Sequence, residues 1–556
     1  MKRKFIQILS TVAAVITVSS CNLDINKDPY SVTTLDFAQA LTAAEFEVGI
    51  NFSANNYLNS NFSAYVHQTV SREIDNYSLV ANYATLGNTW SQAYRYSIKN
   101  CDIIIQKGDA EGNVIYAGIA RVLRAYTYLN MVDLWGDIPY SQANDGITET
   151  PKTDPSADIY NALLADVNKA LQNFSDKEAA NELKPGANDL FYGGDVEKWV
   201  KAANTLKLKI LVQSRLAKDK MTNWKKELTD LVAEGNFMGD GEDLQFPHSS
   251  AKTPQDERNP GFVAEYAGGQ KSVWISPWFY ECLSGTNYNW KNNPFRGIKD
   301  PRIPYYFYNQ SKAGGDAANQ TDYRDGAFIS IMFGSNSGYT SMTQDSKMTV
   351  VGIYPVGGKF DDGSAKAINS DSGSAAAPDK MLQAYSVPFM LAELILAGEI
   401  AGDAKAELEN GIKASLTHVE KVSQACDKSV PAIADAAKTQ FINAVLAKYD
   451  AADAAGKLEI VITQKWIANF YNPVESYNDI RRTGYPVLFK GDADNKAWTP
   501  YAQTVEATPG LVSYDLVNLL AFPRIMYYPT GETTLNPNIS NVGRIVSNKN
   551  VFWDVK

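Results

Sequence analysis

The fold of this chain is decided by one stretch near its C-terminal end, Glu475-Ser476-Tyr477-Asn478-Asp479-Ile480-Arg481-Arg482-Thr483-Gly484-Tyr485-Pro486. Gly484 can adopt the left-handed conformation that ends a helix, and Pro486 prevents the helix from resuming. Arg481 and Arg482 stand near that end, where they can pair with terminal carbonyl groups and with Asp479 or Glu475. We interpret the stretch as a corner held by packing and ion pairs; a ligand site there is the alternative.

Helical periodicity is found on the N-terminal side of this corner, whereas the chain after Gly484 is mostly irregular. Apolar residues recur at steps of three and four, which indicates helices with one buried face. The segments are Phe37–Phe46, Trp90–Lys107, Ile119–Leu134, Ile159–Leu171, Trp199–Leu216, Tyr385–Ile400, Ala404–His418, Ala432–Tyr449 and Lys457–Phe470. They recur in pairs of roughly 30 to 40 residues, the spacing of tetratricopeptide-like repeats. The sequence therefore predicts an all-α fold of helix pairs, although it has no strict sequence repeat.

The middle of the chain has a different character. Residues 237–382 are rich in Gly, Asn, Ser, Asp, Pro and aromatic residues and have few long apolar periodicities. A structureless loop of this length is uncommon, so we expect a loop-rich inserted subdomain with short helices and short strands, at Ala327–Phe333 and Met348–Tyr354. The full prediction is a signal peptide (1–20), a tether (21–36), a helical-repeat part (37–236), the inserted subdomain (237–382), and C-terminal helices with an irregular tail (383–556), forming one body.

The N-terminus has the pattern of a secretory signal. Lys2, Arg3 and Lys4 precede an apolar stretch, and Val18-Ser19-Ser20-Cys21 closes it with small residues before a cysteine. This order resembles a bacterial lipobox, which predicts cleavage before Cys21 and lipid attachment to its thiol. The alternative is an ordinary secretory peptide that ends in a chance cysteine. No second apolar run is long enough to span a bilayer, so the mature protein is expected to be a soluble body on a lipid tether.

Charge and metal-ligand content exclude several functions. The formal net charge is −10, which disfavours nucleic acid as a partner. Only three histidines are present, and none has a second His or Cys at metal-ligand spacing, so we expect no metal site and no cofactor. Beyond Cys21, the remaining cysteines are Cys101, Cys282 and Cys426. We expect three buried free thiols; a disulfide between two of them is the alternative.

The 475–486 stretch closely resembles the most characteristic segment of the SusD/RagB family of Bacteroidetes surface lipoproteins. Further matches follow in family order: Ala120–Tyr126 with Leu134–Tyr140, Lys198–Leu208, Asp300–Arg302, Phe389–Glu393, and Pro523–Ile525 with Pro529, Glu532 and Asn536. The resemblance spans nearly the whole mature chain. The Tyr477-Asn478-Asp479 form of the C-terminal segment and the Leu134–Asp137 turn resemble the corresponding segments of a SusD-like subgroup that differs from the starch-binding prototype. This difference puts starch itself in doubt as the ligand.

The resemblance implies both a fold and a role. Members are built on tetratricopeptide-like helix pairs with a loop-rich face. They sit as a lid on a SusC-like TonB-dependent transporter in the outer membrane, and they bind a glycan or another nutrient for import without catalysis. By this resemblance we expect the protein to be anchored in the outer membrane and to face the extracellular side.

Glycan binding requires aromatic rings that stack on sugars and polar groups that pair with hydroxyls. Two stretches combine these residue types. The candidate ligand residues are Arg72, Asp75, Tyr77 and Trp90 in the first, and Trp274, Trp278, Tyr288 and Trp290 in the second. The spacing of Trp90 and Tyr94 favours a core position for Trp90, whereas core and ligand roles are equally supported for Trp278 and Trp290.

Catalytic signatures do not appear in the sequence. Motifs for a zinc peptidase, a dinucleotide or nucleotide site, a nucleophile elbow or an EF-hand are missing. We therefore expect a binding protein and no enzyme. The rivals are a binder of peptides or another nutrient, a purely structural lid, and a glycosidase with two carboxylates whose separation the sequence does not reveal.

Overall fold

The computed structural model describes residues 36–52, 62–71, 86–268, 271, 273–288, 290, 292–313, 321–333, 345–491, 498–500, 522–548 and 551–556. Helices dominate these residues, as the sequence predicts, and the strands are few and short. The predicted signal segment, Cys21 and the tether up to residue 35 lie outside the described residues. None of the described helices is both long and apolar enough to cross a membrane.

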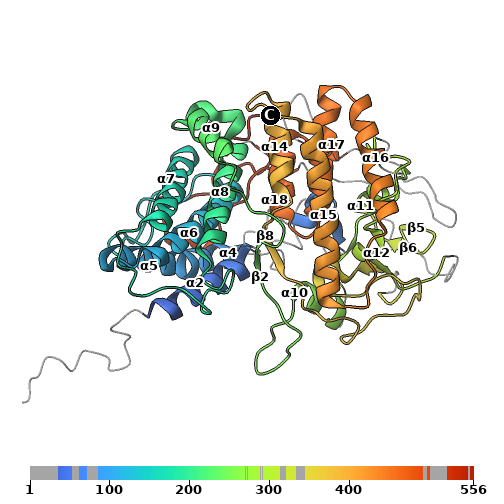
Figure 1. The fold of residues 1–556 in the computed structure, drawn as a ribbon, viewed down its shortest axis with the longest axis horizontal. Helices are drawn as coiled ribbons and strands as arrows, with labels where there is room; N and C mark the ends of the chain where they lie inside the picture. Colours follow the sequence, from blue (N-terminus) through green and yellow to red (C-terminus); the bar gives the residue numbers. More distant parts are fainter. Residues whose placement is uncertain are drawn as a thin grey trace, which may run out of the picture.

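The first group of helices occupies one side of the molecule (Figure 1). It contains α2 (Phe37–Phe52), α4 (Gly87–Gln92), the π-helix η3 (Ala93–Ile98), α5 (Lys99–Glu111), α6 (Val114–Trp135), α7 (Ser156–Ser175), α8 (Val196–Ser214), the 3-10 helix η4 (Arg215–Lys220) and α9 (Trp224–Glu234). The central helix α6 packs against both α5 and α7 and is buried on nearly all sides. All five helices predicted before residue 237 are present, and α9 is an addition to them.

The second group stands beside the first (Figure 1). It contains α14 (Ser386–Leu396), α15 (Ala404–Cys426), α16 (Asp435–Ala451), α17 (Ala454–Ala468) and α18 (Pro473–Thr483). Asp403 begins α15 as its N-cap, because its carboxylate accepts hydrogen bonds from the backbone N–H groups of Lys405 and Ala406. Helix α18 contacts both α17 and α8, so it joins the two groups.

The remaining strands and helices are short, and most of them lie in the middle of the chain. The antiparallel pairs are β1 (Thr69–Ser71) with β3 (Val273–Ile275), β2 (Leu244–Phe246) with β8 (Asp379–Leu382), β4 (Phe307–Asn309) with β7 (Thr349–Val351), β5 (Tyr323–Asp325) with β6 (Phe328–Ser330), and β9 (Phe489–Gly491) with β10 (Trp498–Pro500). The short helices are α10 (Pro260–Phe262), η5 (Val263–Ala267), α11 (Pro277–Ser284), α12 (Ile303–Tyr306), α13 (Ile353–Val356) and α19 (Thr530–Leu535). Both predicted strands are present, as β6 and β7, although the second gives way to α13 after Val351.

The corner at α18 is a buried ionic centre. Arg482 donates to both carboxylate oxygens of Glu393 on α14, at 2.9 and 2.8 Å, and to Asp479, at 2.6 Å. Burial opposes ionisation of Glu393, but Arg482 and Arg215 lower its pKa to about 2. Gly484 ends α18 with a φ of 83°, as predicted. The predicted pairing with Asp479 is confirmed, while Glu475 pairs instead with Lys209 of α8.

The neighbouring Arg481 binds backbone carbonyls from two distant segments. Its guanidinium donates to the carbonyl oxygen of Asp133 at 2.7 Å and to that of Arg524 at 2.8 Å. Arg524 is in turn paired with Asp554. The α18 corner therefore holds the end of α6 and the C-terminal segment together, far from its own position in the sequence.

The three cysteines in the described part of the chain are free, as predicted. Cys101 and Cys282 are buried, whereas Cys426 is only partly buried. Burial raises the pKa of the Cys426 thiol to about 11, so it stays protonated near neutral pH.

Candidate functional site

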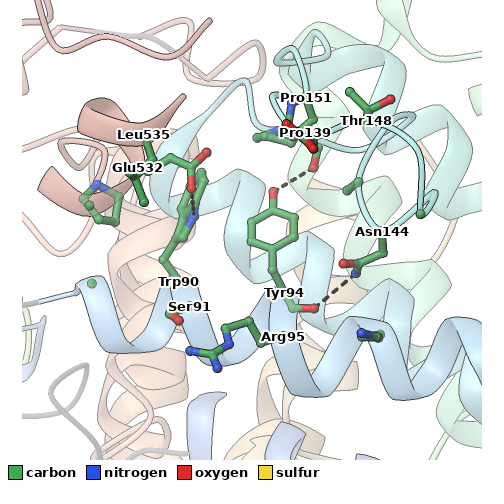
Figure 2. Close-up of a pocket in the computed structure, with 17 residues that line it drawn as sticks. Trp90, Ser91, Tyr94, Arg95, Pro139, Asn144, Thr148, Pro151, Glu532 and Leu535 are labelled. Atoms are coloured by element: carbon green, nitrogen blue, oxygen red, sulfur yellow. Dashed lines mark hydrogen bonds between the residues drawn. The ribbon is translucent and has the colours of Figure 1, made fainter. Parts of the chain in front are cut away.

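A cavity of about 750 Å³ opens where three distant segments meet (Figure 2). One wall is the continuous helix formed by α4, η3 and the start of α5. The second is the loop 139–151, and the third is the segment 529–535, which includes α19. The helix contributes Trp90, then Tyr94 and Arg95 four and five residues later, and Lys99 four residues after Arg95, so each step along the helix is about one turn and all four border the cavity. A π-helix at this position is a feature often found at functional sites.

The loop wall is held by one carboxylate and one amide. Asp154 accepts hydrogen bonds from the backbone N–H groups of Tyr140, at 2.9 Å, and Ser141, at 2.8 Å. On the other side, the Asn536 side chain donates to the carbonyl oxygen of Pro151 at 2.9 Å. Asp154 therefore holds the start of the loop, and Asn536, next to α19, holds its end, so this wall of the cavity is fixed.

Trp90 belongs to the hydrophobic core and also lines the cavity. Its side chain is 4% exposed, and its ring meets Trp135 edge-on with centroids 5.2 Å apart. Its indole N–H donates to Glu532 at 3.2 Å, as Figure 2 shows. The core position that its helical spacing favours is confirmed, and the ring also borders the cavity.

Tyr94 and Asn144 connect the helix to the loop. The Tyr94 hydroxyl donates to the carbonyl oxygen of Pro139 at 2.7 Å, and the Asn144 amide donates to the Tyr94 carbonyl oxygen at 3.1 Å (Figure 2). Burial, followed by the charges and dipoles of Tyr128 and Glu532, raises the pKa of Tyr94 well above its ordinary value. The hydroxyl is therefore neutral and available only as a fixed part of the wall.

The exposed groups of the cavity are Arg95, Lys99, Asn144, Glu149 and Leu535, which is 80% exposed. This mixture of an apolar contact, an amide and charged groups suits a ligand with both apolar faces and hydroxyl or charged edges. In the part of the chain that the structure describes, no three His, Cys, Asp or Glu side chains are placed to hold a metal ion.

The second predicted cluster lies mostly inside the protein. Trp274 is 0% exposed in β3, Trp278 is 5% exposed in α11, and Trp290 is 3% exposed. Trp278 packs against His67 with ring centroids 4.8 Å apart, and Trp290 meets Trp466 at 6.0 Å. Neighbouring protein groups thus cover these three rings, and the structure does not bring them to the Trp90 cavity. Tyr288 is 38% exposed at the surface.

The remaining predicted residues, Arg72, Asp75 and Tyr77, lie outside the described residues. Conversely, the cavity contains side chains that the sequence did not single out as ligand residues, namely Tyr94, Arg95, Lys99, Asn144, Glu532 and Leu535. Tyr94 carries a usable signal, because it follows Trp90 by one helical turn. The other walls come from loops with no periodicity, and only the fold brings them together.

Comparison with known proteins identifies the family. The model of the SusD-like family, described as starch-binding and associating with the outer membrane, matches residues 29–502. The chain belongs to the SusD-like family. A curated relative, the SusD-like protein P2 of Formosa agariphila, is 29% identical over 135 residues, which cover 22% of this chain and a quarter (25%) of that relative.

Solved structures show that the SusD-like fold extends over nearly the whole chain. A SusD/RagB family protein from Bacteroides thetaiotaomicron matches with a TM-score of 0.66 at 20% identity, covering 94% of this chain and 99% of that one. A chitin-binding SusD homolog from Flavobacterium johnsoniae matches with a TM-score of 0.64 at 18% identity. The match covers 94% of this chain and 99% of the homolog. At these identities the likeness establishes the fold.

Proposed function

We propose that this SusD-like protein captures an oligosaccharide at the cell surface and passes it to a SusC-like TonB-dependent transporter. The observation that carries the proposal is the family match over residues 29–502, because that family is described as carbohydrate-binding and outer-membrane-associated. The chitin-binding homolog from Flavobacterium johnsoniae supports a glycan as the ligand class. The protein itself carries out no chemical step in this proposal.

The cavity bordered by Trp90 is the proposed ligand site. Its volume of about 750 Å³ falls in the range of pockets that hold small ligands, and its walls are fixed by hydrogen bonds. Tyr94 and Leu535 offer apolar surface to sugar rings, and the Asn144 amide and the charged groups offer partners to hydroxyls. Because few rings are open to stacking, affinity should be modest, about micromolar or weaker.

Anchoring by lipid at Cys21 completes the proposal. A lipid tether would keep the body at the outer membrane, next to the transporter and facing outwards. Replacing Cys21 by Ala should release the protein from the membrane fraction, and protease treatment of whole cells should digest the wild-type protein. Retention of the variant in the membrane pellet would contradict the anchor.

The ligand site can be tested with two matched glycine variants. Gly531 lines the cavity and Gly186 does not, and a side chain added at either position meets open space. Calorimetry against a glycan panel should find a ligand for the wild type. Gly531→Trp should weaken that binding by about tenfold or more, since the indole occupies the cavity, whereas Gly186→Trp should not.

The same mixtures distinguish the rival functions. Binding without released reducing ends supports capture for import. Reducing ends that appear at enzymatic rates would establish a glycosidase, and binding of peptides without any glycan would establish a different nutrient. Equal affinity of the Gly531→Trp variant and the wild type would place the glycan site elsewhere on the protein.

A further inference from the structure

We propose that the cavity selects glycans that carry an anionic substituent, a uronic-acid carboxylate or a sulfate ester, through Arg95 and Lys99. This inference rests on the proposed function and names the ligand class of the same site. The two cations stand one helical turn apart, at positions i and i+4, and both are exposed on the helical wall of the cavity.

Neither cation has an anionic partner among the residues that the structure describes. Within the part of the chain that the structure describes, Arg95 and Lys99 form no ion pair, and Arg95 lies only over the neighbouring Tyr96 ring, 5.4 Å from its centroid. Like charges one turn apart on a helix repel each other. An anion bound between them would relieve that repulsion, which gives the site a preference for negative charge.

Two arginines of the neighbouring helix α6, by contrast, are neutralised. Arg124 pairs with Asp102 at 2.7 Å and with Asp166 at 2.5 Å, and Arg121 pairs with Asp109. The chain as a whole carries ten more negative than positive charges. Arg95 and Lys99 are unpaired among the described residues of this acidic protein, and both border a cavity. They therefore mark a place where an external anion can bind.

The two carboxylates that line the cavity, Glu532 and Glu149, form no ion pair with Arg95 or Lys99 in the described structure. Glu532 accepts hydrogen bonds from the Trp90 indole, at 3.2 Å, and from the Asn536 amide, at 3.1 Å. Figure 2 shows Glu532 at the far end of the Trp90 ring, with Arg95 on the helix at the other end. Glu149 is exposed on the loop wall and pairs with neither cation. The helical wall is thus the cationic side of the cavity.

The geometry fits a charged sugar better than a neutral one. A guanidinium can bind a carboxylate or a sulfate through two parallel hydrogen bonds, and a lysine adds a second charge. The sugar ring that carries the anion would lie towards Tyr94 and Leu535, so its apolar face would leave water as its charge is paired.

The test compares glycans that differ only in charge. The panel contains oligogalacturonates with their methyl-esterified forms, and sulfated oligosaccharides with their desulfated forms. We expect the acidic member of a pair to bind about tenfold more tightly, with affinity that falls as salt screens the contact. The pair that shows this difference identifies the anion as carboxylate or sulfate.

Substitutions at Arg95 and Lys99 test whether these two residues cause the preference for acidic glycans. Arg95→Gln and Lys99→Gln, both at exposed positions, should lower affinity for the acidic glycan about tenfold and leave the neutral one unchanged. Lys169→Gln, an exposed and unpaired lysine on α7, is the matched control and should change neither. Equal binding of charged and neutral partners, or insensitivity to both cavity variants, would overturn this inference while glycan capture stands. Binding to no glycan of either kind would instead overturn the proposed function, and this inference with it.

Discussion

At the scale of single residues, the most consequential contact is the pair between Arg482 and Glu393. Both side chains are at most 1% exposed, and Arg215 reaches the same carboxylate at 3.0 Å. Glu393→Ala would take this carboxylate away from Arg215 and would leave Arg482 only partly compensated, by Asp479. Removing one partner of a buried pair costs about 3–5 kcal/mol, so the urea midpoint of unfolding should fall sharply.

An exposed pair provides the comparison for that measurement. Lys413 and Glu409 lie 2.7 Å apart on the surface of α15, where water competes with the contact. Lys413→Ala should leave the urea midpoint within error of the wild type. Similar losses in Lys413→Ala and Glu393→Ala would contradict a special role for the buried pair.

At the scale of elements, Gly484 decides where α18 stops. Its φ of 83° lies in the left-handed region, which a Cβ disfavours by about 1–2 kcal/mol. Gly484→Ala should therefore lower the thermal midpoint, because the turn after α18 keeps its geometry at the expense of strain. Gly531→Ala in α19 has ordinary helical geometry and open space, so it should be neutral or slightly stabilising. Equal effects at both glycines would argue against strain as the cause.

At the scale of the whole molecule, buried carboxyl groups make stability depend on pH. Burial raises the pKa of Glu265 to about 8, against an ordinary value of 4.5, although Lys271 lies close by. The folded state therefore holds a proton that the unfolded state has already released, and Glu265 costs stability as pH rises from about 4.5 to 8. Glu265→Gln should match the wild type near pH 4 and exceed its thermal midpoint increasingly up to pH 9.

Glu393 has the opposite effect on how stability changes with pH. Its folded pKa of about 2 lies below the ordinary 4.5, so its stabilising contribution is present above pH 4.5 and is lost as pH falls towards 2. Glu393→Gln should consequently be least stable, relative to the wild type, above pH 4.5. Parallel pH profiles for the Glu265→Gln variant and the wild type would show that the pKa of Glu265 is the same in the folded and unfolded states.

The helices and the α18 corner were predictable because their signals are local. Apolar spacing identifies α6 and α15, and Gly484 with Pro486 marks the end of α18 from a few neighbouring residues. The burial of Trp274, Trp278 and Trp290 was not predictable in the same way. Their segment has no periodicity, and β1 covers Trp274 from about 200 residues away in the sequence. Polar neighbours such as Asn287 made a buried segment resemble a surface loop.

The cavity shows the same limit more clearly. Trp90 and Tyr94 could be placed on one helix face from spacing alone, but Glu532 and Leu535 reach them only through the tertiary fold. The contact between Trp90 and Glu532 joins residues 442 positions apart. No local pattern carries information over that separation, so the third wall of the site appears only in the structure.

The wall that α19 contributes has a consequence for the order in which the cavity forms during folding. The contact between Trp90 and Glu532 spans 442 positions of the sequence, so the first helix pairs can form before the segment 529–535 closes that side of the cavity. Met526 and Arg544 fasten this late segment to the end of α6, through the carbonyl oxygens of Leu134 and Trp135. The proposed ligand site is therefore complete only after residues 529–535 have docked against the rest of the fold.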